Sequence, residues 1–167
     1  NKRWYNFVMK NIFSYSKEKL ENEFVANGYK KFMALQVFEW LYQKEEYDVN
    51  LYSNIKIENR KFIEDNYSFD MIKIEKVEED IDVKKFLFRL LDGQKIEAVL
   101  MYHDYGLSIC VSSQVGCNMG CKFCESGRLK KVRNLETYEI VEQIILINND
   151  IGERIDTYHC KRLKILE

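Results

Sequence analysis

Three cysteines in one short loop constrain this chain of 167 residues more than any other feature. The segment QVGCNMGCKFCESG carries them in C-x3-C-x2-C spacing, at Cys117, Cys121 and Cys124. Thiols this close together suit a metal centre, around which the loop must fold tightly. Glycine permits such tight folding, and the segment supplies Gly116, Gly120 and Gly127. The loop is therefore the first candidate for a chemical site.

The number of thiols separates two kinds of metal centre. A structural zinc site is closed by four ligands. The fourth ligand would have to come from residues without a standard zinc spacing, namely His103, Cys110, His159 and Cys160. Three thiolates instead suit a 4Fe-4S cluster that keeps one iron open for a small molecule. The spacing favours the open cluster, and a zinc site or a loop without metal are the alternatives.

The composition, 46% hydrophobic and 32% charged, indicates a globular chain with a real core, in one domain or two small ones. The net charge of −1 gives no overall attraction to nucleic acid or acidic lipid, so any such binding needs a local patch. The apolar runs, such as that at residues 144–147, are far too short to cross a bilayer. Since no signal peptide is visible, we expect a cytoplasmic protein without membrane contact, whose thiols stay reduced.

The hydrophobic spacing predicts helices in the first part of the chain. Ser16 can cap a helix that ends at the turn signal Asn27-Gly28. A second helix, over about residues 33–43, is apolar nearly all round, so we expect it to be buried. A third and weaker helix is predicted over about residues 57–66.

After the helices, the hydrophobic pattern changes to the period of two that is typical of strands. The sequence predicts four strands, at residues 71–77, 83–91, 95–101 and 107–113. Asp92-Gly93 is a strong hairpin signal between the second and the third. A long amphipathic helix follows the cysteine loop, with apolar residues between Ile140 and Ile151.

Around the cysteines the sequence resembles a known family. The segments ICVSSQVGCNMGCKFCESG, KKVRNL and EIVEQI are similar to those of the radical S-adenosylmethionine (SAM) RNA adenine methyltransferases, the RlmN/Cfr family. The segments GYKKFMALQVFEWLYQK and KIEAVLM also resemble this family, and the resemblance covers roughly residues 9–156. It is closer to the branch that methylates C2 of adenine in 23S ribosomal RNA, and often in transfer RNA, than to the C8-methylating branch.

The resemblance implies an α+β N-terminal module, with helices and then a small antiparallel sheet. The first βα unit of a radical SAM partial TIM barrel (α/β) would follow it. We therefore expect a helical accessory, RNA-binding domain at residues 9–75. The strand region and the start of the radical SAM domain, with the cluster loop 117–124, would occupy residues 76–156. The tail at 157–167 does not look like the family, and no Gly-Glu-Pro SAM-binding segment is present. We expect an N-terminal fragment that is inactive alone.

The same resemblance implies cofactors and catalytic residues. Cys117, Cys121 and Cys124 would hold the 4Fe-4S cluster, SAM would bind its open iron, and a donor such as flavodoxin or ferredoxin would supply electrons. A radical route suits the electron-poor C2 carbon of adenine. Glu97 would take a proton from the protein–RNA adduct. Cys110 would attack a methyl-carrying cysteine near the family's C-terminus, form a disulfide with it and release the RNA.

The local pattern alone favours non-catalytic interpretations of these two residues. A glutamate on an alternating strand, such as Glu97, is most often part of a solvated face. A single cysteine between Ile109 and Val111, such as Cys110, is most often a small buried hydrophobic residue. Their catalytic roles are therefore implied by the resemblance and not by the pattern.

Basic residues crowd the cysteine loop, where Glu125 is their one acidic neighbour. Such a patch could neutralise RNA phosphates, and an ordinary solvated loop is the alternative. The candidate RNA-binding residues are Lys122, Arg128, Lys130, Lys131 and Arg133. The function that follows is methylation of an adenine C2 in 23S rRNA, and possibly in tRNA. The runner-up is a non-enzymatic RNA-binding module with a zinc- or cluster-stapled loop.

Overall fold

The structure is a computed structural model, and it describes residues 9–118 and 129–152. The chain divides into two compact units, Asn1–Asp70 and Met71–Glu167. This division lies a few residues before position 75, the expected end of the accessory domain, so the strand that begins at Lys73 belongs wholly to the second unit.

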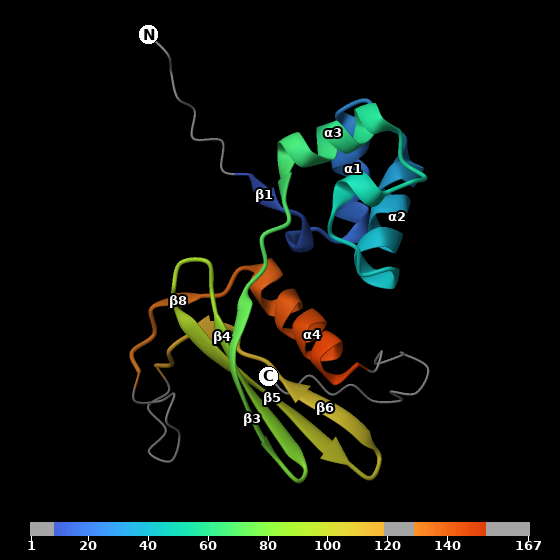
Figure 1. Ribbon diagram of the computed structural model, residues 1–167. Coiled ribbons are helices and arrows are strands. Elements are labelled where there is room, and N and C mark those ends of the chain that lie inside the picture. The colour runs from blue at the N-terminus through green and yellow to red at the C-terminus, as the bar shows by residue number, and fades with distance from the viewer. Residues whose placement is uncertain (1–8, 119–128, 153–167) are drawn as a thin grey trace. The chain divides into compact units, whose positions relative to one another are not determined.

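The first unit is a small helical unit (Figure 1). Its helices are α1 (Lys17–Ala26), α2 (Lys31–Phe38) and α3 (Ile57–Asn66), with the short turns η1 (Ile12–Ser14), η2 (Glu39–Gln43) and η3 (Val49–Leu51). The strands β1 (Lys10–Asn11) and β2 (Tyr67–Ser68) pair in parallel and join the two ends of the unit.

The first predicted helix is confirmed with its cap. Ser16 Oγ accepts a hydrogen bond from the Lys19 backbone N–H at 3.3 Å, which satisfies one of the free donors at the start of α1. The helix ends at Ala26 with Asn27 as its C-cap, and Gly28 follows with a positive φ of 83°.

The second predicted helix, at residues 33–43, differs from the structure in two ways. It begins at Lys31, and from Glu39 the α-helix widens into the π-helical turn η2. Its burial is also one-sided. Met33 and Val37 are buried, whereas 56% of Phe32 is exposed. Apolar residues all round a helix therefore did not predict full burial here, because the unit is too small to cover both faces.

Aromatic rings form most of the core of the first unit. Phe13, Phe24, Tyr52 and Tyr67 are almost fully buried. Phe24 lies edge-on to Tyr67, with ring centroids 6.0 Å apart, and Phe13 lies edge-on to Tyr47 at 5.6 Å. Edge-to-face contacts of this kind add to the free energy of apolar burial.

The second unit is built on a four-stranded antiparallel sheet in the order β3-β4-β5-β6 (Figure 1). The strands are β3 (Lys73–Asp80), β4 (Val83–Arg89), β5 (Lys95–His103) and β6 (Gly106–Cys110). All four predicted strands are present, and the predicted hairpin closes where the Leu90 N–H donates to Gln94 O at 2.8 Å. The expectation of helices followed by a small antiparallel sheet is confirmed.

One face of this sheet is covered by helix α4 (Thr137–Ile151), as Figure 1 shows. The inner face of the strands carries Phe86, Phe88 and Leu100, which are fully buried in one cluster with Ile147 of α4. This confirms the predicted amphipathic helix after the loop. Among the described residues, no helix has the length and apolar character that a membrane span requires.

The outer face of the sheet carries the alternate residues. On β5 these are Lys95, Glu97 and Val99, and the register places Leu87 opposite Glu97 and Cys110 opposite Val99. Because successive side chains of a strand point to opposite faces, these residues share the face away from α4. The candidate catalytic residues therefore lie on a rigid, hydrogen-bonded surface.

A candidate active site at the neck of the cysteine loop

Two short strands close the neck of the cysteine loop. Strand β7 (Gln114–Val115) pairs antiparallel with β8 (Arg133–Asn134). One step further into the loop, the Cys117 N–H donates to Leu129 O at 2.9 Å. Residues 119–128 lie outside the described residues, and the described residues Cys117 and Leu129 on either side of them are joined by this hydrogen bond.

Gly116 is required at this neck. Its φ is +69°, and a Cβ built on it would lie 2.2 Å from the carbonyl oxygen of Lys130. No real side chain fits at that distance, so the backbones cross here only because residue 116 is glycine. The prediction that glycines allow a tight loop is confirmed at Gly116; Gly120 and Gly127 lie outside the described residues.

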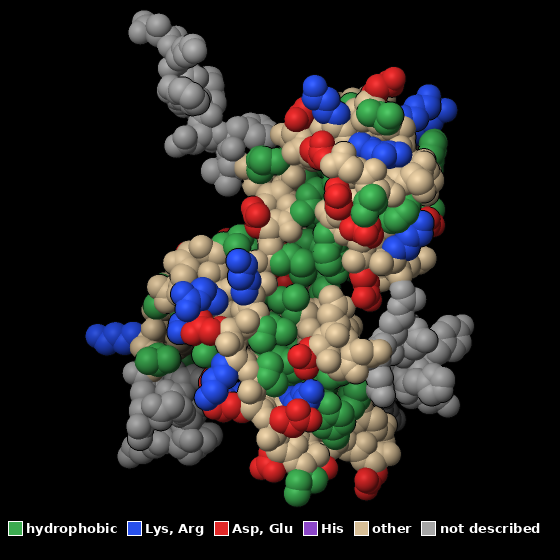
Figure 2. Space-filling model, in the orientation of Figure 1, with side chains coloured by type: hydrophobic (Ala, Val, Ile, Leu, Met, Phe, Trp, Pro, Cys, Tyr) green, Lys and Arg blue, Asp and Glu red, His purple; other side chains and the backbone are tan. Residues whose placement is uncertain are grey.

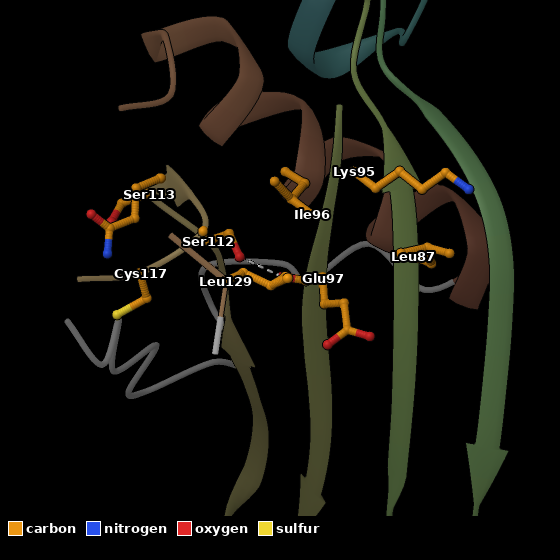
Figure 3. Close-up of a pocket in the computed structure, with 10 residues that line it drawn as sticks. Leu87, Lys95, Ile96, Glu97, Ser112, Ser113, Cys117 and Leu129 are labelled. Carbon is orange, nitrogen blue, oxygen red and sulfur yellow. Dashed lines mark hydrogen bonds between the residues drawn. The ribbon is translucent and has the colours of Figure 1, made fainter. Parts of the chain in front are cut away.

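A pocket of about 370 Å³ lies between the neck and the outer face of the sheet. Figure 3 shows its walls, with Cys117 from the neck and Glu97 from β5 among the labelled residues. Its apolar lining residues include Leu87, Ile96 and Leu129, and its polar ones include Ser112 and Lys95. A concave, mostly apolar space with a few polar groups is the usual form of a small-molecule or nucleobase site.

Glu97 lies on the solvent-exposed face of the sheet and also at the pocket. Its side chain is about half exposed, at 49%, as a solvated face predicts, but it also lines the pocket. The carboxylate pairs with Lys85, with 3.3 Å between Oε1 and Nζ. The Glu97 backbone carbonyl accepts a hydrogen bond from Ser112 Oγ at 2.7 Å, which ties β5 to the segment after β6 (Figure 3).

The buried Gln143 holds the segment after β6 in turn, and it is not among the site residues predicted from the sequence. Gln143 of α4 is fully buried, and its side-chain amide binds both backbone groups of Ser112. Its Oε1 accepts from the Ser112 N–H at 2.9 Å, and its Nε2 donates to Ser112 O at 3.0 Å. The signal in the sequence that could have predicted this role of Gln143 was a polar residue among the apolar positions of an amphipathic helix.

Cys110 is exposed at the end of β6, so the interpretation that the local pattern alone favours, a small buried hydrophobic residue, is wrong. It lies opposite Val99, one outer-face position along β5 from Glu97. In the described part of the chain, Cys110 is not among the residues that line the pocket, but it shares the face of the sheet on which the pocket opens.

Of the three predicted cluster ligands, the structure describes Cys117, which is partly buried at the pocket wall. Cys121 and Cys124 lie outside the described residues. Within residues 9–118 and 129–152, no group of three His, Cys, Asp or Glu could hold a metal ion. His103, one candidate for a fourth zinc ligand, is instead bonded through Nε2 to Ser108 Oγ at 2.8 Å.

The five candidate RNA-binding residues differ in their surroundings. Lys130 and Lys131 are exposed at the neck, and Lys122 and Arg128 lie outside the described residues. On the face in view in Figure 2, basic side chains lie beside acidic ones over much of the second unit.

Arg133 is engaged within the fold. Its Nη2 lies 2.7 Å from Glu139 Oε1 and 2.7 Å from Asp92 Oδ2. The bond to Glu139, followed by that to Asp92, raises the pKa of Arg133. Burial alone would raise the pKa of Asp92, but the Gln94 backbone N–H and the Arg133 guanidinium lower it below 3.8. Arg133 thus ties the neck to the β4–β5 turn and to the start of α4.

Comparison with known proteins gives the family context. Residues 10–68 match the family described as the ribosomal RNA large subunit methyltransferase N-terminal domain. A crystal structure of a radical SAM methyltransferase from Sphaerobacter thermophilus is similar with a TM-score of 0.73 and 28% identity, covering 86% of this chain and 44% of that one. The matched part of the chain is therefore similar in fold and sequence to a radical SAM methyltransferase.

Curated relatives show higher sequence identity than this structure does. A Spiroplasma citri protein is 48% identical over 141 residues, which are 84% of this chain and 41% of the relative. An Enterococcus faecalis protein is 46% identical over 144 residues, covering 86% and 40%. Both are named probable dual-specificity RNA methyltransferase RlmN, so the resemblance to the RlmN branch is confirmed. The chain spans about two fifths of the length of these relatives.

Proposed function

We propose that the chain takes part in radical SAM methylation of C2 of an adenine in 23S rRNA, and also in tRNA. The observation that carries the proposal is the shared pocket of Cys117 and Glu97, at the base of the loop with the three-cysteine motif. The RlmN relatives support the choice of RNA as substrate. Reaction on ribosomal or transfer RNA agrees with a cytoplasmic location.

Cys117, together with Cys121 and Cys124, would hold a 4Fe-4S cluster that also binds SAM, with electrons from a flavodoxin or ferredoxin. The neck fits this role, because Gly116 lets the two ends of the loop cross closely and Cys117 lies at the pocket wall. When bound, these cofactors supply the radical chemistry that an electron-poor ring carbon needs.

Residues of this chain would bind the target adenine and act on its covalent adduct. A target adenine must leave its stack to be modified, and the pocket offers apolar walls at Leu87 and Leu129 to receive it. Glu97 would accept the proton that leaves the covalent adduct. Cys110, with its exposed thiol, would act as the resolving nucleophile that frees the RNA.

The exposed Lys130 and Lys131, with Lys122 and Arg128, would contact RNA phosphates, as would the helical first unit. Arg133 is not included, because Asp92 and Glu139 already neutralise its charge. We also propose that β6, the cysteine loop and α4 form the first βα unit of a radical SAM partial TIM barrel.

Anaerobic reconstitution with iron and sulfide tests the cofactor part of the proposal. Metal analysis and electron paramagnetic resonance are expected to show one 4Fe-4S cluster per chain, with a signal that changes when SAM is added. One tightly held zinc per chain without a cluster signal would instead support the runner-up function, an RNA-binding module with a metal-stapled loop.

A further inference from the structure

A row of ion pairs crosses the outer face of the sheet in the second unit. Glu78 of β3 lies directly opposite Lys85 of β4, and the register places Lys85 diagonally beside Glu97 of β5. Lys85 Nζ lies 3.3 Å from Glu78 Oε2 and 3.3 Å from Glu97 Oε1. Lys76 Nζ binds the other oxygen of Glu78 at 2.6 Å. One ammonium group is therefore shared between two carboxylates, of which one lines the pocket.

The contact between Lys85 and Glu97 affects the orientation of the Glu97 carboxylate more than the stability of the fold. Exposed ion pairs of this kind contribute little to the free energy of folding. A half-exposed glutamate, however, samples several rotamers unless a partner holds it. Side-chain contacts with Glu78 and then Glu97 raise the pKa of Lys85 above 10.5, so its ammonium group stays charged at neutral pH. A cation fixed on a central strand can thus hold the Glu97 carboxylate in one orientation.

We propose that Lys85 is a positioning residue for Glu97, and that it holds the carboxylate in the orientation that the reaction at the pocket requires. The inference rests on the proposed role of Glu97. In that step, a proton leaves carbon 2 of the adduct, its bonding electrons stay with the adduct, and a Glu97 oxygen receives it. Loss of Lys85 would slow this step without removing the base itself.

The same face offers a matched control. Arg89 pairs with Glu75 at 2.8 Å, also across neighbouring strands, and is not among the described residues that line the pocket. Arg89→Met therefore removes one cation and one ion pair from the same face but leaves Lys85 and Glu97 in place. Glu78→Gln is a second probe, because it weakens the competing hold on Lys85.

The contact itself can be tested in the 167-residue chain without any cofactor. A carbodiimide joins an amine and a carboxylate that touch, so peptide mapping should find Lys85 coupled to Glu97 as well as to Glu78. Glu78→Gln should raise the yield of the Lys85–Glu97 product. Coupling of Lys85 to Glu78 alone would overturn the inference.

The functional consequence is tested by methyl transfer to unmodified RNA, with the protein expressed at its full genomic length. Lys85→Met is expected to lower kcat about tenfold with KM for RNA nearly unchanged, and Lys85→Arg should restore most of the rate. Covalent RNA adduct should accumulate in Lys85→Met, with Cys110→Ala marking the adduct band on a denaturing gel. Arg89→Met should behave as the unsubstituted protein, and all variants should show the same thermal unfolding.

The possible results separate the inference from the proposed function. A normal kcat in Lys85→Met, or a rise in KM alone, would overturn the positioning role and leave the proposed function intact. Absence of methylation by the unsubstituted protein would overturn the proposed function, and the role of Lys85 would fall with it.

Discussion

The backbone of Gly116 crosses that of Lys130 so closely that a Cβ on Gly116 would lie 2.2 Å from the Lys130 carbonyl oxygen. This crossing closes the neck of the cysteine loop, and the hydrogen bond from Cys117 N–H to Leu129 O continues it. The position of the first cluster ligand at the pocket therefore depends on a residue that has no side chain.

Gly116→Ala should open this neck. The methyl group meets backbone atoms, which cannot move aside cheaply, and the positive φ adds strain, so we expect a loss of at least about 2 kcal/mol in unfolding free energy. Iron retained after anaerobic reconstitution should fall several-fold.

Gly93→Ala is the matched control, because Gly93 has a φ of +84° but no atom within 4 Å of the place that a Cβ would take. It carries the conformational strain without the clash, at a cost of about 1 kcal/mol. Equal iron retention in both variants would show that the close crossing is unimportant for the metal site.

Arg133→Met should destabilise the second unit far more than changes at the neighbouring lysines. Glu139 has 1% of its side chain exposed and would lose its guanidinium partner, at a cost of about 3 kcal/mol. Lys131→Met, a change of the same kind at an exposed site, should stay within about 0.5 kcal/mol. Urea unfolding of both variants measures the difference, and equal midpoints would contradict the structural role of Arg133.

The Asp92–Arg133 pair should also make stability depend on acid. Because the Gln94 backbone N–H and the Arg133 guanidinium lower the pKa of Asp92 in the folded state against the effect of burial, these contacts contribute stability above pH 3.8 that is lost as the pH falls through the folded-state pKa. Urea unfolding midpoints should therefore drop as the pH is lowered below about 4. Asp92→Asn should drop less steeply over that interval, and an identical slope in both proteins would argue against the pair.

RNA affinity should depend on Lys130 and Lys131 and on salt. Reversing both to Glu should weaken binding and reduce the slope of log affinity against log salt by about two, since fewer counterions are released. Lys73→Glu, an exposed charge reversal at the start of β3, should leave the slope unchanged. Filter binding at several salt concentrations measures it, and an unaltered slope in the double variant would show that these lysines form an ordinary solvated surface.

Local signals predicted most of the fold. The Ser16 cap, the Asp92-Gly93 hairpin and the alternation along β4 and β5 depend on neighbours in sequence, and each appears where it was expected. One-sided burial of α2 was not predictable in the same way, because the exposure of Phe32 depends on how much chain surrounds the helix.

The site was predictable in part. The pocket joins Glu97, which the family resemblance predicted, with Cys117, which the cysteine spacing predicted. Arg133 looked like one more charge of a basic loop, because its partners Asp92 and Glu139 come together only in the folded unit. Gln143 was missed for the same reason, since its partner Ser112 lies 31 positions earlier in the chain.

The most direct measurement of the central claim is the identity of the methylated nucleoside. Unmodified 23S rRNA is incubated with labelled SAM, a reducing system and the protein at its full genomic length, and the RNA is then digested to nucleosides for mass spectrometry. We predict label in 2-methyladenosine, loss of that product in Glu97→Gln, and none from the 167-residue chain alone. Label on another atom, or no labelled adenosine from the full-length protein, would contradict the account.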